Sequence, residues 1–209
     1  MASTAEAATT GWEQDVKPVL EQYWPHPTPT ELKQPSKPAA SAYISAYNKI
    51  YDICCHHNHE DSAKLVMPPL EMIVEDWITA ARAYIEAEGE SKVLERYLET
   101  WTVFQVARSL TSHVYRYPDR HLFPQWEDGG TRLPTDYARQ PVERHIPSDA
   151  VPLRRWRLGI YEPILNNDNG VAILKAAIPA DDTVKKKEVK DILHACSAQY
   201  GEAPIDSLK

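Results

Sequence analysis

The sequence predicts an all-α protein. Glycine is scarce, with 7 residues, whereas 17 prolines divide the 209-residue chain into blocks. Within those blocks, apolar side chains recur at the three- and four-residue spacing of amphipathic helices. No Asn-Gly or Asp-Gly turn lies between two alternating, strand-like runs. We therefore expect an array of about seven helices with irregular connections.

The N-terminal part is expected to contain one short and one prominent helix. Residues 1–10 are small and polar and predict a disordered leader. Residues 12–24 predict a short helix whose regularity is limited by Pro18, and residues 25–38 an extended, proline-rich connector. The clearest helix spans residues 39–57. Its apolar arc covers about 180°, wider than the ~100° that one core requires, so this helix should contact its own core and something else.

Two further helices are expected in the middle of the chain. Residues 58–64 predict a polar loop, and Pro68 and Pro69 are compatible with the start of the next helix. Residues 91–117 predict one long helix or two abutting ones. The apolar face changes sides midway along this segment, so it lies between different neighbours or is kinked.

The C-terminal part begins with a long proline-rich stretch, residues 118–152, that has little periodicity. The helix expected after it is marked by spaced apolar residues, namely Leu153, Trp156, Ile160 and Ile164. Residues 171–178 and 189–200 predict two more helices. Arg154, Arg155 and Arg157 are expected on a solvated helix face, with Trp156 turned inward.

Composition argues against several classes of protein. Hydrophobic residues make up 43% and charged residues 25%, which is typical of globular domains. The net charge of −7 argues against nucleic-acid binding. No apolar run approaches the roughly 20 residues of a membrane span, and no secretory signal is visible. The three cysteines form a poor disulfide framework, so we expect a cytoplasmic or nuclear protein.

Three segments carry a family resemblance. AYISAYNKIYDICC (residues 42–55) has tyrosines at i, i+4 and i+8 before a cysteine. VLERYLETWTVF (93–104), followed by YPDRH (117–121), has a Tyr-x3-Trp core and a Tyr-x-Asp-Arg turn. LRRWRLGIYEPI (153–164) is close to Leu-x2-Trp-Arg-x3-Phe-x-Pro-Leu/Ile. In order and spacing these segments resemble the N-terminal repeats of cullins, the elongated scaffolds of ubiquitin ligases. Prolines 118, 147 and 152 depart from the family pattern.

The resemblance implies a cullin-repeat-like helical array of about one and a half repeats. Residues 11–121 would form the first repeat, residues 122–152 an irregular proline-rich connector, and residues 153–209 the start of a second repeat. The chain would lack the cullin-homology region. We therefore expect neither binding of a RING subunit nor modification by NEDD8 in the manner of the family.

The resemblance also implies a partner. The first cullin repeat docks a BTB/POZ-fold adaptor through its second and fifth helices. Carried onto this sequence, the adaptor-binding residues are Tyr43, Ile44, Tyr47, Tyr51 and Tyr117. Ala46, Ile50 and Ile53 would face the interior of the repeat. The adaptor would be of the type that carries F-box proteins; the alternative is that these tyrosines only complete the domain core.

Other chemistry is weakly indicated. CCHHNHED (residues 54–61) contains zinc-binding residue types but no second pair at zinc-finger spacing, so a helix end and polar loop are favoured over a metal site. No catalytic motif is present, and neither a cofactor nor enzymatic activity is expected. The alternatives to a scaffold are a short cullin-like competitor that sequesters adaptors, and a helical-repeat interaction protein without adaptor binding.

Overall fold

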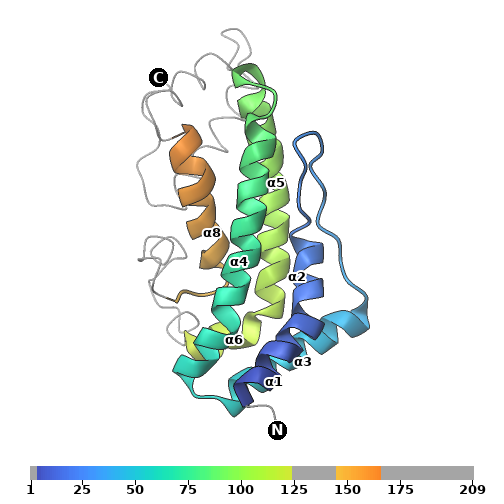
Figure 1. Cartoon of the computed structure of the whole chain (residues 1–209), viewed down its shortest axis with the longest axis vertical. Coiled ribbons are helices and arrows are strands. Elements are labelled where there is room, and N and C mark those ends of the chain that lie inside the picture. The colour runs from blue at the N-terminus through green and yellow to red at the C-terminus, as the bar shows by residue number, and fades with distance from the viewer. Residues whose placement is uncertain (1–3, 124–144, 166–209) are drawn as a thin grey trace.

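A computed structural model describes residues 4–123 and 145–165, and over this range the fold is all-α, as predicted. Two long helices, α4 (His59–Glu86) and α5 (Glu90–Val114), run antiparallel and form the spine of the molecule (Figure 1). The turn between them contains Gly89, whose φ of 81° lies in the left-handed region that glycine adopts without a Cβ clash. The described residues contain no β-strand.

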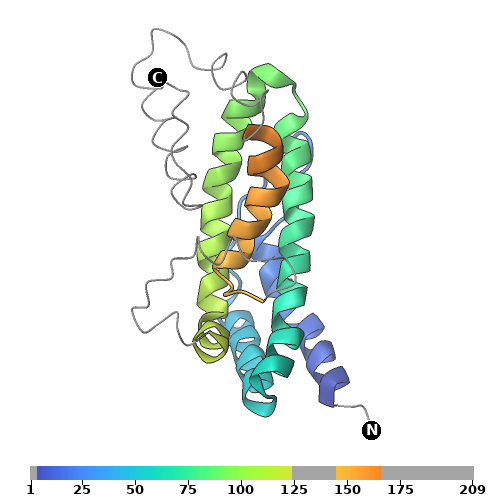
Figure 2. The same ribbon diagram turned by 90° about the vertical axis from the view of Figure 1, so that its left-hand side faces the viewer.

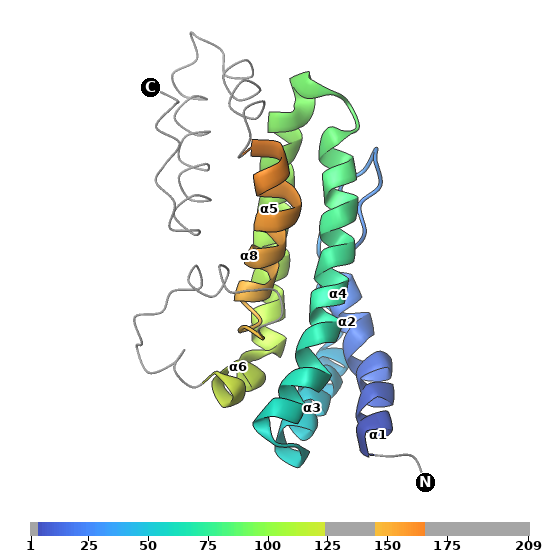
Figure 3. The same cartoon turned by 60° about the vertical axis from the view of Figure 1, so that its left-hand side comes forward.

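Shorter helices pack around this spine. The helix α8 (Ala150–Trp156) continues into the wider turns of η3 (Arg157–Leu165). It packs on α4 and α5 where these two helices lie side by side (Figure 2). The helix α2 (Lys17–Tyr23) packs against α4 and α5 from another side. At one end of the spine, α1 (Thr4–Gly11), α3 (Ala40–His56) and α6 (Arg116–Leu122) gather (Figure 3).

The N-terminal segment differs from expectation. Residues 4–10, which we expected to be disordered, form α1, and Ala8 is buried in the core. This segment is rich in alanine, which has the highest helix propensity of any residue. The chain then widens into a π-helical turn, η1 (Trp12–Val16), where the Lys17 N–H donates to the carbonyl of Trp12, five residues back. This wide turn ends at Val16, two residues before Pro18, which has no N–H to donate.

The helix α3 lies where the sequence predicts it. Its inward residues are Ala46, Ile50, Ile53 and Cys54, all buried. The prediction that Ala46, Ile50 and Ile53 face the interior is therefore confirmed.

The start of α4 was predicted wrongly. The helix begins at His59, so residues 59–64, expected to form a loop, are helical. Asn58 caps it: its Oδ1 accepts a hydrogen bond from the Asp61 N–H at 2.9 Å. Pro68 and Pro69 lie inside the helix instead of starting it. The two prolines cannot donate main-chain hydrogen bonds to the preceding turn. Val66, Met67 and Leu70 around them are buried, and this packing stabilises the helix where those hydrogen bonds are missing.

The prediction that residues 91–117 lie between different neighbours is confirmed. The segment forms one helix, α5, up to Val114, before α6 starts at Arg116. On one side, the Tyr97 hydroxyl accepts a hydrogen bond from Trp156 Nε1 of α8 at 3.2 Å. On another side, Thr111 Oγ1 accepts one from Trp24 Nε1 at 2.9 Å.

Aromatic side chains form much of the core. The described tryptophans are all buried, namely Trp12, Trp24, Trp77, Trp101 and Trp156. Trp24 packs edge-on against Trp77 with ring centroids 5.3 Å apart, and Phe104 lies 4.6 Å from Trp156. These contacts join α2, α4, α5 and α8 into one hydrophobic cluster.

The arginine cluster was also predicted wrongly in part. Trp156 points inward as expected, but the Arg154 side chain is only 1% exposed instead of solvated. Its Nη2 lies 2.7 Å from Glu71 Oε1 of α4, and Arg155 Nη2 lies 2.8 Å from Glu71 Oε2. A carboxylate buried midway along α4 requires cationic partners, and α8 supplies them.

The structure joins the segments on both sides of the predicted connector. Residues 150–165, assigned from sequence to the end of the connector and the start of a second repeat, pack into the same core as residues 4–123. The buried Asp119 of α6 accepts hydrogen bonds from the Ser148 N–H at 2.7 Å and from its hydroxyl at 2.6 Å. Most of the connector, residues 124–144, and the helices predicted at 171–178 and 189–200 lie outside the described residues.

Among the described helices, none has the length and apolar character needed to cross a membrane.

Candidate interaction site

The outward side of α3 carries apolar side chains that the core does not cover. Ile44 is 55% exposed and Tyr51 is 41% exposed, whereas Tyr43 and Tyr47 are half-buried. These four residues lie along one edge of the wide apolar arc of α3, whereas buried Ala46, Ile50 and Ile53 lie along its other edge. The wide apolar arc of this helix therefore covers the core along one edge and leaves apolar side chains exposed along the other.

The helix α6 adds an aromatic ring from a distant part of the sequence. The Tyr117 ring contacts the Tyr51 ring, with centroids 4.5 Å apart. Its hydroxyl lies 3.6 Å from the Cys55 Sγ atom, within hydrogen-bonding range for sulfur. This hydrogen bond, with partial burial, raises the pKa of Tyr117 to about 12, so the ring stays neutral at physiological pH. We call the surface formed by Tyr43, Ile44, Tyr47, Tyr51 and Tyr117 the aromatic face.

Two histidine rings, one packed on the other, extend the aromatic contacts of Tyr117. The Tyr117 ring stacks on His121 of α6 at a centroid distance of 5.6 Å, and His121 meets the His59 ring edge-on at 4.4 Å. Burial, with the nearby His59, lowers the pKa of His121, which favours its neutral form. The Tyr117 ring is thus held by contacts with both Tyr51 and His121.

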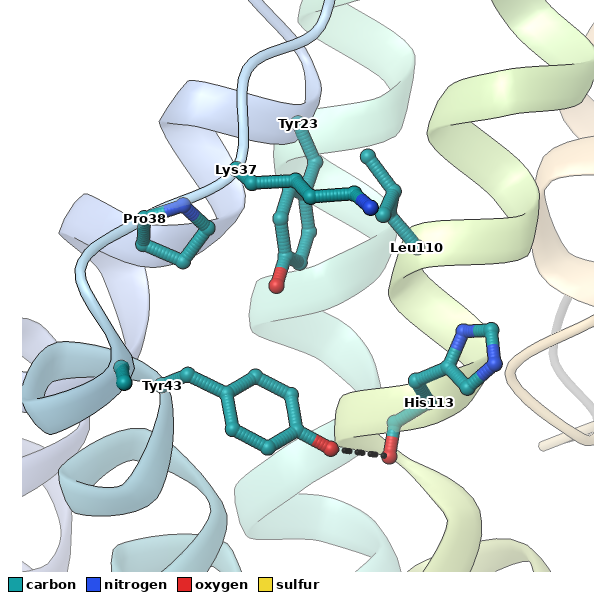
Figure 4. Close-up of a pocket in the computed structure, with 7 residues that line it drawn as sticks. Tyr23, Lys37, Pro38, Tyr43, Leu110 and His113 are labelled. Atoms are coloured by element: carbon teal, nitrogen blue, oxygen red, sulfur yellow. Dashed lines mark hydrogen bonds between the residues drawn. The ribbon is translucent and has the colours of Figure 1, made fainter.

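The other end of the aromatic face borders a pocket. The Tyr43 hydroxyl donates a hydrogen bond to the main-chain oxygen of His113 at 3.3 Å, which ties α3 to the end of α5 (Figure 4). The Tyr43 ring also forms one wall of a cavity of about 370 Å³. The remaining lining residues come from α2, the connector before α3, the start of α3 and α5: Tyr23, Lys37, Pro38, Ala40, Leu110 and His113.

The chain was compared with known proteins at the level of families, individual sequences and folds. No protein-family model, curated protein or solved structure matches it.

The predicted site residues come together only in part. Tyr51 and Tyr117, which the resemblance assigns to the same surface, are in direct contact. Tyr43 lies two helical turns from Tyr51, about 12 Å along α3 at 1.5 Å per residue. Tyr43 and Tyr47 are half-buried, so they contribute part of their area to the core and part to the surface. The aromatic face is thus a stripe and not a compact cluster.

Several contributing residues were not predicted. Cys55 and His59 were considered only as metal ligands, although they position Tyr117 directly or through His121. The described residues contain no group of three or more histidine, cysteine or acidic side chains arranged to hold a metal ion. Cys54 is buried whereas its neighbour Cys55 is exposed, so the two thiols point in different directions.

Proposed function

We propose that this protein is a non-catalytic helical module that binds a BTB/POZ-fold adaptor through the aromatic face. The observation that carries the proposal is the exposure of Ile44 and Tyr51 beside Tyr117, on a face built from two helices. Apolar and aromatic side chains that cover no core are typical of protein-binding surfaces.

The energetics of the aromatic face favour docking. Tyrosine buries a large area but loses few rotamers on binding, which is why it is common at the centre of interfaces. Tyr51 and Tyr117 already rest on each other, and Tyr43 is held by its hydrogen bond to His113. A partner therefore meets side chains that are largely ordered before binding, which reduces the entropic cost of association.

The class of partner is supported by the resemblance of residues 42–55, 93–121 and 153–164 to the cullin repeat. In that family the second helix of the first repeat carries tyrosines that dock the adaptor. We accordingly assign the protein to ubiquitin-dependent degradation, with a cytoplasmic or nuclear location and an adaptor of the F-box-carrying type. A competitor that sequesters adaptors and a helical interaction protein without adaptor binding are the two alternatives.

Calorimetric titration against purified BTB/POZ-fold adaptors tests the proposal. The chain offers a matched pair of variants: Ile44→Asp on the aromatic face, and Met72→Asp on α4, where Met72 is 66% exposed. We expect micromolar or tighter binding that Ile44→Asp weakens by roughly 2 kcal/mol or more, and that Met72→Asp leaves unchanged. Tyr51→Ala should weaken binding in the same direction.

The outcomes separate the three functions. If the folded protein binds no adaptor in the panel, adaptor binding is excluded and the helical interaction protein is favoured. Equal losses for Ile44→Asp and Met72→Asp would place the interface elsewhere. If binding is confirmed, adding the protein to a reconstituted ubiquitination reaction distinguishes a competitor, which lowers product formation, from a productive scaffold.

A further inference from the structure

The pocket beside Tyr43 combines an apolar floor with a positively charged rim. Tyr23 and Leu110 form the floor, and the Tyr43 ring closes it on one side (Figure 4). The Lys37 side chain extends across the pocket towards Leu110, and its amine carries a positive charge. Among the lining residues in the described part of the chain, none is acidic.

The two basic side chains at the rim are available to a ligand. Lys37 is exposed and takes part in no ion pair within the described residues 4–123 and 145–165. The exposed His113 uses Nδ1 to donate to the Ser109 carbonyl oxygen at 2.7 Å, which leaves Nε2 for another partner. The positive charge of Lys37 makes this rim complementary to a carboxylate.

We propose that the pocket receives an acidic segment of a partner polypeptide, which inserts one apolar side chain between Tyr23 and Tyr43 and pairs a flanking carboxylate with Lys37. The pocket volume of about 370 Å³ is sufficient for a large side chain. A polypeptide fits better than a small organic acid because the rim is exposed and one solvated ion pair contributes little affinity. A longer segment can also cover Ile44, which directly follows Tyr43 on α3 and is exposed.

This inference deepens the proposed function, because it specifies the chemistry that a partner of the aromatic face supplies at its Tyr43 end. It nevertheless depends on residues outside the aromatic face, namely Tyr23, Lys37 and Leu110, and the two sites share Tyr43. The aromatic face is tested by substitution at Ile44 and the pocket by substitution at Lys37, so the two can fail independently.

The test is an NMR titration of the ¹⁵N-labelled full chain with three blocked peptides. The acidic probe is acetyl-Glu-Glu-Phe-Glu-amide. Its controls are acetyl-Lys-Lys-Phe-Lys-amide, which reverses the charge, and acetyl-Glu-Glu-Ser-Glu-amide, which removes the apolar group. We expect saturable amide shifts around Tyr43, Leu110 and His113 with the acidic phenylalanine peptide and with neither control.

Two charge reversals provide the matched variants. Lys37→Glu should weaken binding of the acidic peptide by about fivefold or more, because attraction at the rim becomes repulsion. Lys33→Glu makes the same change at an exposed lysine of the same connector that does not line the pocket, and should leave binding unchanged.

Three results would overturn the proposal: no saturable shifts with the acidic peptide, equal binding of the basic one, or equal weakening by Lys33→Glu and Lys37→Glu. Adaptor calorimetry then separates the pocket from the proposed function. Adaptor binding that persists without peptide binding refutes only the pocket, whereas peptide binding without adaptor binding refutes only the adaptor.

Discussion

Replacing Glu71 by glutamine tests whether its carboxylate stabilises the contact between α4 and α8 by neutralising the buried Arg154. Glu71 accepts hydrogen bonds from Arg154 at 2.7 Å and Arg155 at 2.8 Å. The Arg154 side chain is 1% exposed, so water cannot replace the lost carboxylate charge. Removing one partner of a buried ion pair costs about 3–5 kcal/mol. Arg155 also lies 3.2 Å from Glu75, so we expect the lower part of that range, about 3 kcal/mol.

The matched control is Glu75→Gln. Its carboxylate bonds the same Arg155, but its side chain is 56% exposed, so the expected loss is about 1 kcal/mol or less. Urea unfolding followed by circular dichroism measures both values. A change in midpoint without a change in slope identifies an effect on stability. Losses that agree within about 0.5 kcal/mol would refute the view that Glu71 neutralises a buried charge.

The remaining predictions concern pH and backbone conformation. Burial raises the pKa of Asp119 from 3.8 to about 7, despite the hydrogen bonds from Ser148. Between about pH 4 and pH 7 the folded state retains a proton that the unfolded state has lost, so the contribution of Asp119 to stability falls as the pH rises. Asp119→Asn should remove this part of the slope in urea midpoints measured across that range; an unchanged slope would contradict it. Gly89→Ala should destabilise the protein by about 1–2 kcal/mol, because Gly89 has a φ of 81°. Thermal unfolding measures this loss, and an unchanged melting temperature would show that the turn relaxes.

Local periodicity was sufficient to predict the helices whose pattern is uninterrupted. The segment around Ile50 was predicted to within one residue at each end, because its buried and exposed sides differ clearly along a proline-free stretch. The same reasoning failed at Pro68 and Pro69. The helix propensity of proline is low except in the first turn, which predicts a helix start at these positions. The prolines nevertheless lie inside α4, because the buried residues around them stabilise the helix there.

Features created by tertiary contacts could not be predicted from sequence. Arg154 reads as a solvated side chain until Glu71, 83 positions earlier, is placed beside it. The pocket likewise depends on Tyr23, Lys37 and His113, which no short motif connects. The exposed stripe on α3 was predictable because a single helix carries it, whereas the position of Tyr117 against Tyr51 depended on the packing of α6.

The burial of the tryptophans has an optical consequence. Four of their indole N–H groups donate to partners on other elements of the fold: Tyr115, Thr111, the Pro25 carbonyl and Tyr97. Apart from Trp126, which lies outside the described residues, tryptophan emission therefore reports on the interior. The aromatic residues of the aromatic face are all tyrosines. A shift in emission from these buried indoles on adding a partner would accordingly mean that the bundle itself repacks, whereas docking onto a rigid surface would leave their spectrum unchanged.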